Sequence, residues 1–286
     1  MNSSVVEKYS KQKMTGSHFT PAELAKAVAR RLLSNMGKSH SDTIFVMDPS
    51  CGDGELLLNF ALESKGYKLN LLGIEEDLQS IEIAKARLDC LDINAEFNCI
   101  DFFSLVSKQA NFDYKPDKYL VDVIIANPPY VRTQILGADY SQRLAKEYNL
   151  SGRVDLYHAF LVAMTSQLKI GGLLGVITSN RYLTTKGGSS VRKFLAEHYE
   201  IIEIIDLGDT KLFEAAVLPA VFFGRKKANK SIGQKEPANF LRIYETDKEV
   251  IEKTISVSSI YDIIGSSRNG VYSINNKNTQ YQMENY

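Results

Sequence analysis

Short apolar runs alternate with amphipathic stretches along most of the chain. Seven runs have the length and composition of buried strands, and they are 44–47, 69–74, 95–99, 121–126, 173–178, 201–207 and 218–223. Helical patterns separate most of them, for example Leu24, Val28 and Leu32 at intervals of four residues. This alternation predicts a parallel sheet that is buried on both faces. The last two strands are joined by a segment without a clear crossover helix, so we expect them to run antiparallel.

Three boundaries can be predicted from turn and capping residues. Thr20 suits the N-cap, and Pro21 the first position, of the first helix. Asp155 is a plausible N-cap for a later helix, which Gly171-Gly172 would end before the strand at 173–178. The polar stretch Arg132–Val154 between the fourth strand and this helix predicts a loop with a short helix.

Composition and charge exclude several classes of protein. The 286 residues include 34 Lys and Arg against 34 Asp and Glu, so a uniformly basic nucleic-acid binder is excluded. No apolar run approaches the ~18 residues of a membrane span, and the polar N-terminus shows no secretory signal. Four scattered histidines and three cysteines predict no metal site, no disulfide scaffold and a cytoplasmic location. His158 is expected to be a surface or packing histidine rather than a catalyst, and Cys90 and Cys99 are expected to be small core residues.

Candidate chemistry follows four of the predicted strands. In an open α/β sheet, ligands bind outside the carboxyl ends of the strands. The first segment, Asp48-Pro-Ser-Cys-Gly-Asp-Gly54, contains glycines that let backbone approach a ligand. Glu75 follows Gly52 by 23 residues and could bond ribose hydroxyls. In Asp101-Phe102, the carboxylate could accept from an adenine amino group and the ring could pack on the base.

The segment Asn127-Pro128-Pro129-Tyr130 is the most specific of the four. Two successive prolines keep the backbone extended and remove two donors, which leaves carbonyl oxygens free to point outward. Beside them are an amide side chain and an aromatic ring. Such a site offers acceptors for an exocyclic amino group and a surface on which a flat ring can stack.

The chain resembles the gamma class of S-adenosylmethionine-dependent N6-adenine DNA methyltransferases, which belong mostly to bacterial restriction–modification systems. The resemblance runs from about residue 16 to 226 and is carried by GSHFTP, DPSCGDG, GIEED, IDFF, NPPY, DLYHAFL and IIDLGDTKLFEAAVLPAVFF. It implies a Rossmann-like methyltransferase fold, with a mostly parallel seven-stranded sheet, an antiparallel edge hairpin and helices on both faces. Localisation would be the cytoplasm of a bacterium or archaeon.

The resemblance also implies which residues bind S-adenosylmethionine. Those around the methionine part would be Thr20, Pro21, Asp48, Ser50, Cys51, Gly52 and Gly54. Glu75 would hold the ribose hydroxyls. Asp101 would accept from the adenine amino group, with Phe102 and Pro129 on the two sides of that ring.

For the target base, the resemblance implies four catalytic residues. Asn127 Oδ1 and the Pro128 carbonyl would accept hydrogen bonds from the N6 amino group of an adenine flipped out of double-stranded DNA. Tyr130 would stack on this base, and Phe213 would meet its other face or edge. Two acceptors on the amino hydrogens would localise the nitrogen lone pair for attack on the sulfonium methyl, with catalysis by positioning and electrostatics.

The resemblance divides the chain into two parts. Residues 1–245 would form the catalytic domain, and 246–286 a polar extension or the start of an incomplete target-recognition domain. The basic residues Arg225, Lys226, Lys227, Lys230 and Lys235 indicate a linker or the end of the catalytic domain, or contacts to phosphate. Recognition would then need a separate or missing domain or subunit, and a cognate nuclease is a further expected partner.

Three other functions remain open from the sequence. A protein glutamine-amide methyltransferase is one, because that family also places NPPY around a carboxamide nitrogen. The Phe-Thr-Pro segment before the glycine loop and the late Phe213 argue against it. RNA adenine methylation is the second alternative. A non-catalytic subunit is the third, and the intact Asn127–Tyr130 segment argues against that.

Overall fold

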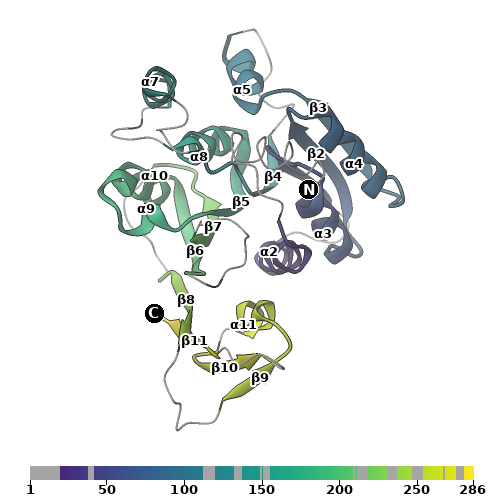
Figure 1. Ribbon diagram of the computed structural model, residues 1–286. Helices are drawn as coiled ribbons and strands as arrows, with labels where there is room; N and C mark the ends of the chain where they lie inside the picture. The colour runs from purple at the N-terminus through teal and green to yellow at the C-terminus, as the bar shows by residue number, and fades with distance from the viewer. Residues whose placement is uncertain are drawn as a thin grey trace, which may run out of the picture.

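The computed structural model contains one sheet of eleven strands, in the order β3-β2-β1-β4-β5-β7-β6-β8-β11-β10-β9 (Figure 1). The residues that it describes are 20–37, 42–111, 120–131, 137–148, 150, 155–208, 210, 218–230, 237–246, 254–266, 268–274 and 280–286. The strands are β1 (Thr43–Asp48), β2 (Lys68–Glu75), β3 (Asn94–Cys99), β4 (Val121–Ala126), β5 (Leu168–Ser179), β6 (Tyr199–Asp206), β7 (Pro219–Lys226), β8 (Asn239–Thr246), β9 (Ile255–Val257), β10 (Gly270–Ile274) and β11 (Gln280–Asn285). All seven predicted strands are present.

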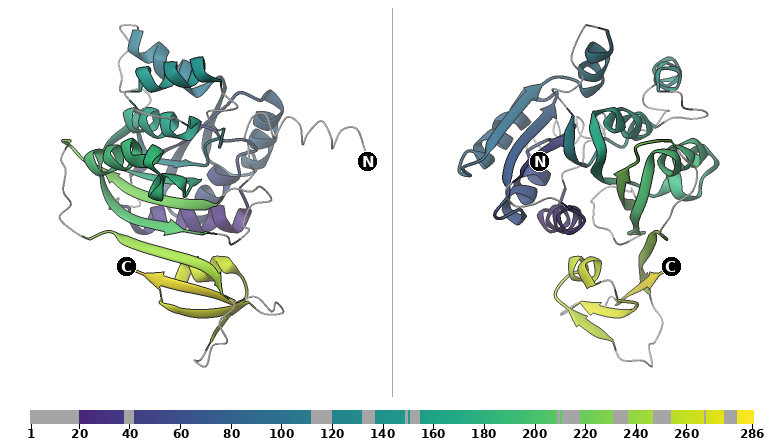
Figure 2. Two further views of the ribbon diagram at one scale, coloured as in Figure 1. Left: turned by 60° about the vertical axis from the view of Figure 1, so that its left-hand side comes forward. Right: turned by 180° about the vertical axis from the view of Figure 1, so that it is seen from behind.

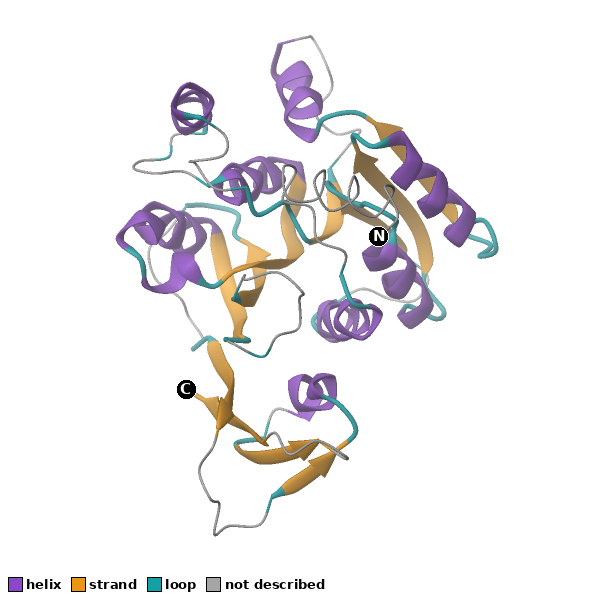
Figure 3. Cartoon of the chain, in the orientation of Figure 1, coloured by secondary structure: helices purple, strands orange, loops and turns teal. Residues whose placement is uncertain are grey.

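Helices follow most of the first strands, as the sequence predicts. They are α2 (Ala22–Ser34), α3 (Glu55–Glu63), α4 (Leu78–Leu88), α5 (Phe102–Asn111), α7 (Ala138–Glu147), α8 (Leu156–Gln167), α9 (Arg181–Thr184), α10 (Ser189–His198) and α11 (Ile260–Ser266), with a short 3-10 turn, η2 (Lys186–Gly188). Helices cover both faces of the sheet (Figure 3). The predicted α/β fold with a mostly parallel sheet is therefore confirmed.

The sheet is longer than predicted, and its antiparallel hairpin is not at an edge. Strands β1 to β5 pair in parallel, and β7 pairs antiparallel with both β5 and β6. The far side of β6 then pairs in parallel with β8, which continues antiparallel into β11. The expected edge hairpin and the count of seven strands are therefore wrong, because the C-terminal residues add four strands beyond β6.

Two apolar layers stabilise this sheet, one on each face. Alternate residues of a strand point to opposite faces. Accordingly, Val123 belongs to the layer that includes residues of α2, α3 and α11, whereas its neighbour Ile124 belongs to the layer that includes residues of α5, α8 and α10. Strand β4 is buried along its whole length, which explains its almost continuous apolar sequence.

The C-terminal strands are joined to the rest of the molecule through β8 and α11. Figure 2 shows β8 between the main part of the sheet and the yellow strands β10 and β11. Arg31 of α2 donates to the carbonyl of Ile264 in α11 at 3.0 Å and pairs with Glu203 of β6 at 3.3 Å. Glu203 is 4% exposed, and burial raises its pKa while Arg31 opposes this. One guanidinium thus connects three elements of the fold.

Two of the predicted boundaries are wrong. Pro21, not Thr20, is the N-cap of α2, and no side chain caps this helix. Gly171 and Gly172 do not end a helix, because α8 ends at Gln167 and β5 already begins at Leu168. The glycines lie where the pairing of β5 with β4 shifts register, and Gly171 has a φ of +76°. They belong to an irregularity within the strand rather than to the end of a helix.

Candidate active site

The four candidate segments lie side by side, because β3, β2, β1 and β4 are neighbours and parallel. Asp48 at the end of β1 pairs in register with Gly73, and Glu75 at the end of β2 pairs with Cys99. We call the edge at which these strands end the carboxyl edge, and the opposite one the amino edge. The structure thus brings the residues after β1, β2, β3 and β4 to one edge of the sheet.

Two glycines shape the turn after β1. Gly52 and Gly54 have φ values of +51° and +81°, in the left-handed region that favours glycine. A Cβ at Gly54 would lie 2.9 Å from Ala84 Cβ, whereas nothing lies within 4 Å of a Cβ at Gly52. Gly54 therefore permits the close approach of α4, and Gly52 leaves open space beside the backbone.

A buried acid begins this turn. Asp48 is 1% exposed, and its Oδ1 accepts from the backbone N–H of Ser50 at 3.1 Å. Burial raises the pKa of Asp48 to about 8 in spite of this hydrogen bond, so the carboxyl is largely protonated at neutral pH. The hydroxyl of Ser50 is buried and has no hydrogen-bond partner among the described residues. Cys51 is buried too, and burial raises the pKa of its thiol, which indicates packing rather than reactivity.

Glu75 is held in one orientation by three backbone donors. Its Oε2 accepts from Gly52 N at 3.0 Å, and its Oε1 accepts from Glu76 N at 2.9 Å and Asp77 N at 3.1 Å. A carboxylate has about four acceptor positions. Oε2 therefore retains a position for a ligand hydroxyl, and this carboxylate need not reorient to bind one.

Asp101 and Phe102 both have structural contacts. Asp101 Oδ2 accepts from the N–H and the hydroxyl of Ser104, each at 2.8 Å, at the start of α5. Phe102 is 2% exposed and stacks on Phe160, with centroids 5.6 Å apart and an interplanar angle of 21°. Little of the Phe102 ring is thus at the surface, and its contact with a cofactor stays a prediction.

The segment after β4 joins the start of α2 through side-chain hydrogen bonds. Asn127 Nδ2 donates to Thr20 Oγ1 at 3.1 Å, and the Tyr130 hydroxyl donates to Asn127 Oδ1 at 2.5 Å. The carbonyl of Pro128 receives no hydrogen bond from the described part of the chain. Burial raises the pKa of Tyr130, so its hydroxyl keeps its proton at neutral pH. Pro21 and Pro129 are partly exposed beside these groups.

Sequence reasoning missed two residues near the end of β3. Tyr140 of α7 and Glu76 both interact electrostatically with Asp101, which helps to raise the pKa of each after the larger effect of burial. The ring of Tyr148 lies 5.5 Å from that of Phe103 and holds α7 against α5. Tyr140, Leu144 and Tyr148 recur every four residues, and this amphipathic pattern was the available signal.

Three further expectations have different outcomes. Phe213 lies outside the described residues. Cys90 and Cys99 are exposed, so their expected place in the core is wrong. His158 is 3% exposed within α8 and packs edge-on against Tyr157, as expected of a packing histidine.

The basic residues expected in a linker include two that belong to β7. Arg225 donates to the carbonyls of Gly171 at 3.1 Å and Asn35 at 2.6 Å, and Lys226 donates to those of Thr165 and Leu168 at 2.7 and 2.6 Å. The linker assignment is therefore wrong for these two. They lie at the amino edge, because β7 runs opposite to β5.

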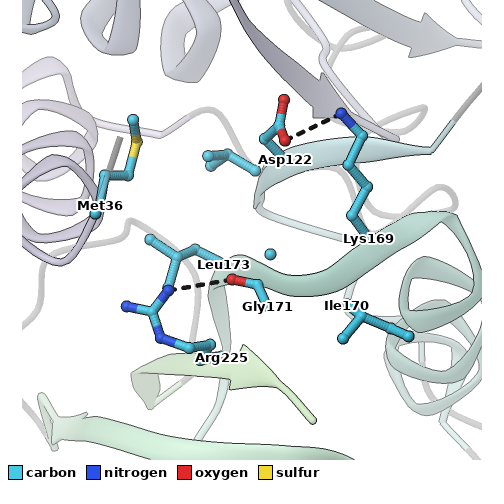
Figure 4. A pocket seen from close by; sticks show the side chains of 10 residues that line it. Met36, Asp122, Lys169, Ile170, Gly171, Leu173 and Arg225 are labelled. Atoms are coloured by element: carbon cyan, nitrogen blue, oxygen red, sulfur yellow. Dashed lines mark hydrogen bonds and ion pairs between the residues drawn. The ribbon is translucent and has the colours of Figure 1, made fainter. Parts of the chain in front are cut away.

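A small hollow also lies at the amino edge, away from the candidate residues. Its volume is about 140 Å³, and it is lined by Met36, Gly37, Asp122, Val123, Lys169, Ile170, Gly171, Gly172, Leu173 and Arg225 (Figure 4). Lys169 pairs with Asp122 across it at 3.0 Å. The charged side chains that line the hollow are bonded to other groups of the protein, so we assign no ligand to it.

Two other kinds of site are absent from the residues that the structure describes. Within the described ranges, no group of three or more His, Cys, Asp or Glu side chains is arranged to hold a metal ion. No described helix combines the length and the apolar character that crossing a membrane requires.

The strand order and the carboxyl-edge site define an α/β protein with the fold of S-adenosylmethionine-dependent methyltransferases. A candidate class I S-adenosylmethionine-dependent methyltransferase from Listeria monocytogenes has a TM-score of 0.62 at 21% identity, over 78% of this chain and 65% of that one. The type IIG restriction endonuclease BpuSI has a TM-score of 0.63 at 17% identity, over 94% of this chain and 31% of that one. At such identities the likeness concerns the fold alone.

Sequence relationship goes further than the fold. A family model for the Eco57I restriction-modification methylase matches residues 67–213, and the chain belongs to this family. It is 50% identical to the type II methyltransferase M.BanIII of Aneurinibacillus aneurinilyticus, over 97% of this chain. The match covers 50% of M.BanIII, so the chain spans about half the length of this relative.

Proposed function

We propose that the chain carries the catalytic part of a DNA methyltransferase of a restriction–modification system, which transfers a methyl group from S-adenosylmethionine to N6 of adenine. Family membership and the type II methyltransferase M.BanIII support methyl transfer in such a system. The position of the Asn127 carboxamide is the observation that supports an amino group as the methyl acceptor. Its oxygen, at the end of β4, already accepts from a hydroxyl donor and lies beside the free carbonyl of Pro128.

The residues of the turn after β1 fit the proposed cofactor. The sulfonium and ammonium groups of S-adenosylmethionine are cationic, and a cation would favour the anion of the buried Asp48 carboxyl. The unpartnered hydroxyl of Ser50 could bond its polar methionine end. Thr20, Pro21, Cys51, Gly52 and Gly54 complete the proposed set around this end.

Two acids would hold the adenosyl group. Glu75, fixed by three backbone N–H groups, would accept from the ribose hydroxyls through Oε2. Asp101 would accept from the adenine amino group while it caps α5. Phe102 and Pro129 would border the adenine ring, Phe102 through the small part that reaches the surface.

The chain's own groups would activate the target nitrogen by accepting hydrogen bonds from its two hydrogens. When bound, S-adenosylmethionine would supply a methyl group on a sulfonium centre, and the thioether of S-adenosylhomocysteine would be the leaving group. Asn127 Oδ1 and the Pro128 carbonyl accept hydrogen bonds from the two amino hydrogens, which makes the nitrogen more tetrahedral and its lone pair more available. Tyr130 stacks on the extruded base, and Phe213 is proposed for its other face or edge. Positioning and electrostatics dominate, so no strong base is required.

The partners of the whole protein are part of this proposal. Double-stranded DNA is the proposed substrate. Because the chain spans about half of M.BanIII, a recognition domain or subunit beyond these residues would supply sequence preference. A cognate nuclease and a cytoplasmic location in a bacterium or archaeon complete the proposal. We keep residues 1–245 as the proposed catalytic part and 246–286 as an extension, although the latter contribute strands to the same sheet.

Methyl transfer from labelled S-adenosylmethionine to duplex DNA, RNA and glutamine-containing protein tests the proposal. We expect label on N6 of adenine in DNA, and no turnover in Asn127→Ala. Asn94→Ala, which alters an exposed side chain at the amino end of β3, is the matched control and should keep its activity. Label on protein glutamine or on RNA alone would overturn the proposal in favour of the two alternatives.

A further inference from the structure

The hydroxyl of Thr20 and the carboxamide of Asn127 meet although 107 residues separate them in the sequence. Thr20 immediately precedes α2, which is anchored on the sheet by the buried side chains of Leu24 and Val28. The helix begins with the hydrogen bond from Ala25 N to Pro21 O at 3.0 Å. The Thr20 hydroxyl thus lies directly before an anchored helix, and it does not cap that helix.

A carboxamide can present either its oxygen or its amino group to a neighbour, and here the two contacts differ in length. The atom facing the Tyr130 hydroxyl is at 2.5 Å, and the atom facing Thr20 Oγ1 is at 3.1 Å. O–H···O hydrogen bonds are shorter than N–H···O bonds, at about 2.7–2.8 Å against about 2.9–3.0 Å. In the structure, Asn127 Oδ1 faces the Tyr130 hydroxyl and Nδ2 faces Thr20 Oγ1, in keeping with this difference.

This orientation decides whether Asn127 can serve a target amino group. When Oδ1 faces the site, it can accept a hydrogen bond from a target amino group in place of the one that it now accepts from the Tyr130 hydroxyl. With the amide reversed, two NH2 groups would face each other as donors, and neither would have an acceptor. A hydrogen bond accepted from Nδ2 also polarises the amide and makes its oxygen a better acceptor.

From these contacts we infer that Thr20 is a positioning residue for methyl transfer, and that its hydroxyl fixes the Asn127 carboxamide with Oδ1 directed to the target amino group. The inference rests on the proposed function and adds to it, because the resemblance places Thr20 only beside the cofactor. The two roles make different demands. A cofactor ligand affects the affinity for S-adenosylmethionine, whereas a positioning residue affects the rate at saturating cofactor.

The test compares Thr20→Val with Thr20→Ser in the protein expressed from its complete reading frame. Valine keeps the shape of threonine and removes the hydroxyl, and serine keeps the hydroxyl. Single-turnover methylation of adenine-containing duplex is measured at saturating DNA and cofactor, with the Kd for S-adenosylmethionine from calorimetry and the melting temperature as a check on folding. We expect T20V to lower the rate about 10- to 100-fold, as misplacement of a reacting group does. Its Kd for the cofactor should change less than the rate does, and T20S should recover most of the rate.

Other outcomes separate two failures. Equal rates for T20V and wild type, equal losses in T20V and T20S, or a raised cofactor Kd at unchanged rate would each overturn the positioning role. If wild type itself methylates no adenine, the proposed function fails and the inference falls with it. If wild type methylates adenine but T20V is unaffected, the proposed function stands and only the inference is lost.

Discussion

Alanine substitution at the two glycines of the turn after β1 should separate backbone strain from steric overlap. Both residues have positive φ, so alanine at either costs about 1–2 kcal/mol of strain. The lower entropy of the unfolded chain returns about 0.4–1 kcal/mol. Gly52→Ala should therefore destabilise the fold by about 1 kcal/mol, because nothing lies within 4 Å of the new Cβ.

Gly54→Ala adds an overlap that Gly52→Ala lacks. The new Cβ would lie 2.9 Å from Ala84 Cβ and 3.2 Å from Ala84 Cα, and the second of these is backbone that cannot rotate away. Overpacking of this kind costs about 1–3 kcal/mol. We therefore expect Gly54→Ala to be less stable than Gly52→Ala by about that amount, because α4 must shift.

Urea unfolding followed by circular dichroism measures both variants against wild type. Calorimetric titration measures the affinity of both variants for S-adenosylmethionine. Gly52→Ala should bind the cofactor more weakly than wild type, although its stability changes little. The reasoning is refuted if Gly52→Ala is as destabilising as Gly54→Ala, since the contact with α4 would then have no energetic effect.

Three further predictions concern charge and hydrogen bonding. Burial raises the pKa of Asp48 above its unfolded value, so the unfolded state loses the proton first and the free energy of unfolding falls as pH rises from about 4 to 8. The stability of Asp48→Asn relative to wild type should therefore rise by about 1.4 kcal/mol per pH unit in urea titrations at pH 5 and 7. Arg31→Met leaves the buried Glu203 carboxylate unpaired and should cost about 3 kcal/mol of unfolding free energy. Tyr130→Phe keeps the aromatic face and should lower kcat/KM for DNA far less than Tyr130→Ala.

Each of these three predictions has a control variant or a result that would contradict it. A constant stability difference between Asp48→Asn and wild type across that pH range would contradict the buried, protonated acid. For Arg31→Met the control is Arg30→Met on the same helix, whose exposed pair with Glu63 should be worth less than about 1 kcal/mol. Equal kcat/KM for the two Tyr130 variants would exclude a stacking role.

Most of the seven strands between 43 and 226 could be predicted because they are largely buried and apolar, and β4 and β7 are so along almost their whole length. β3 is the exception, since none of its residues is fully buried. The four strands that follow these seven could not be predicted. β9, β10 and β11 are short, and their apolar positions are few and alternate with polar ones, as in the half-buried pattern of β11. Such a pattern is hard to distinguish from a polar tail when pairing partners are unknown.

The misplaced boundary at Gly171 has a different cause. A glycine with positive φ can end a helix or form a bulge in a strand, and the local sequence is the same in both cases. Only the pairing of β5 with β4 decides between them. Likewise, the side chains of Arg225 and Lys226 donate to carbonyls that are far away in the sequence. The local run of basic residues does not reveal these contacts, and it therefore suggested a linker.

The candidate site was predictable to the extent that its residues follow strand ends. Asp48, Glu75 and Asn127 were found because parallel strands deliver their carboxyl ends to one edge. The contact of Thr20 with Asn127 could not be found, because a side-chain pair separated by 107 residues leaves no local pattern. The same holds for Tyr140, which approaches Asp101 only through the packing of α7.

The order of strands beyond β6 has a consequence for synthesis on the ribosome. β8 pairs on one side with β6, which is made earlier, and on the other with β11, which is made about 40 residues later. At about 5–20 residues per second, the outer edge of nascent β8 stays unpaired for roughly 2–8 s. An open edge of this kind can pair with another nascent chain. The exposed charge of Arg242, in the middle of β8, acts against such pairing until β11 arrives.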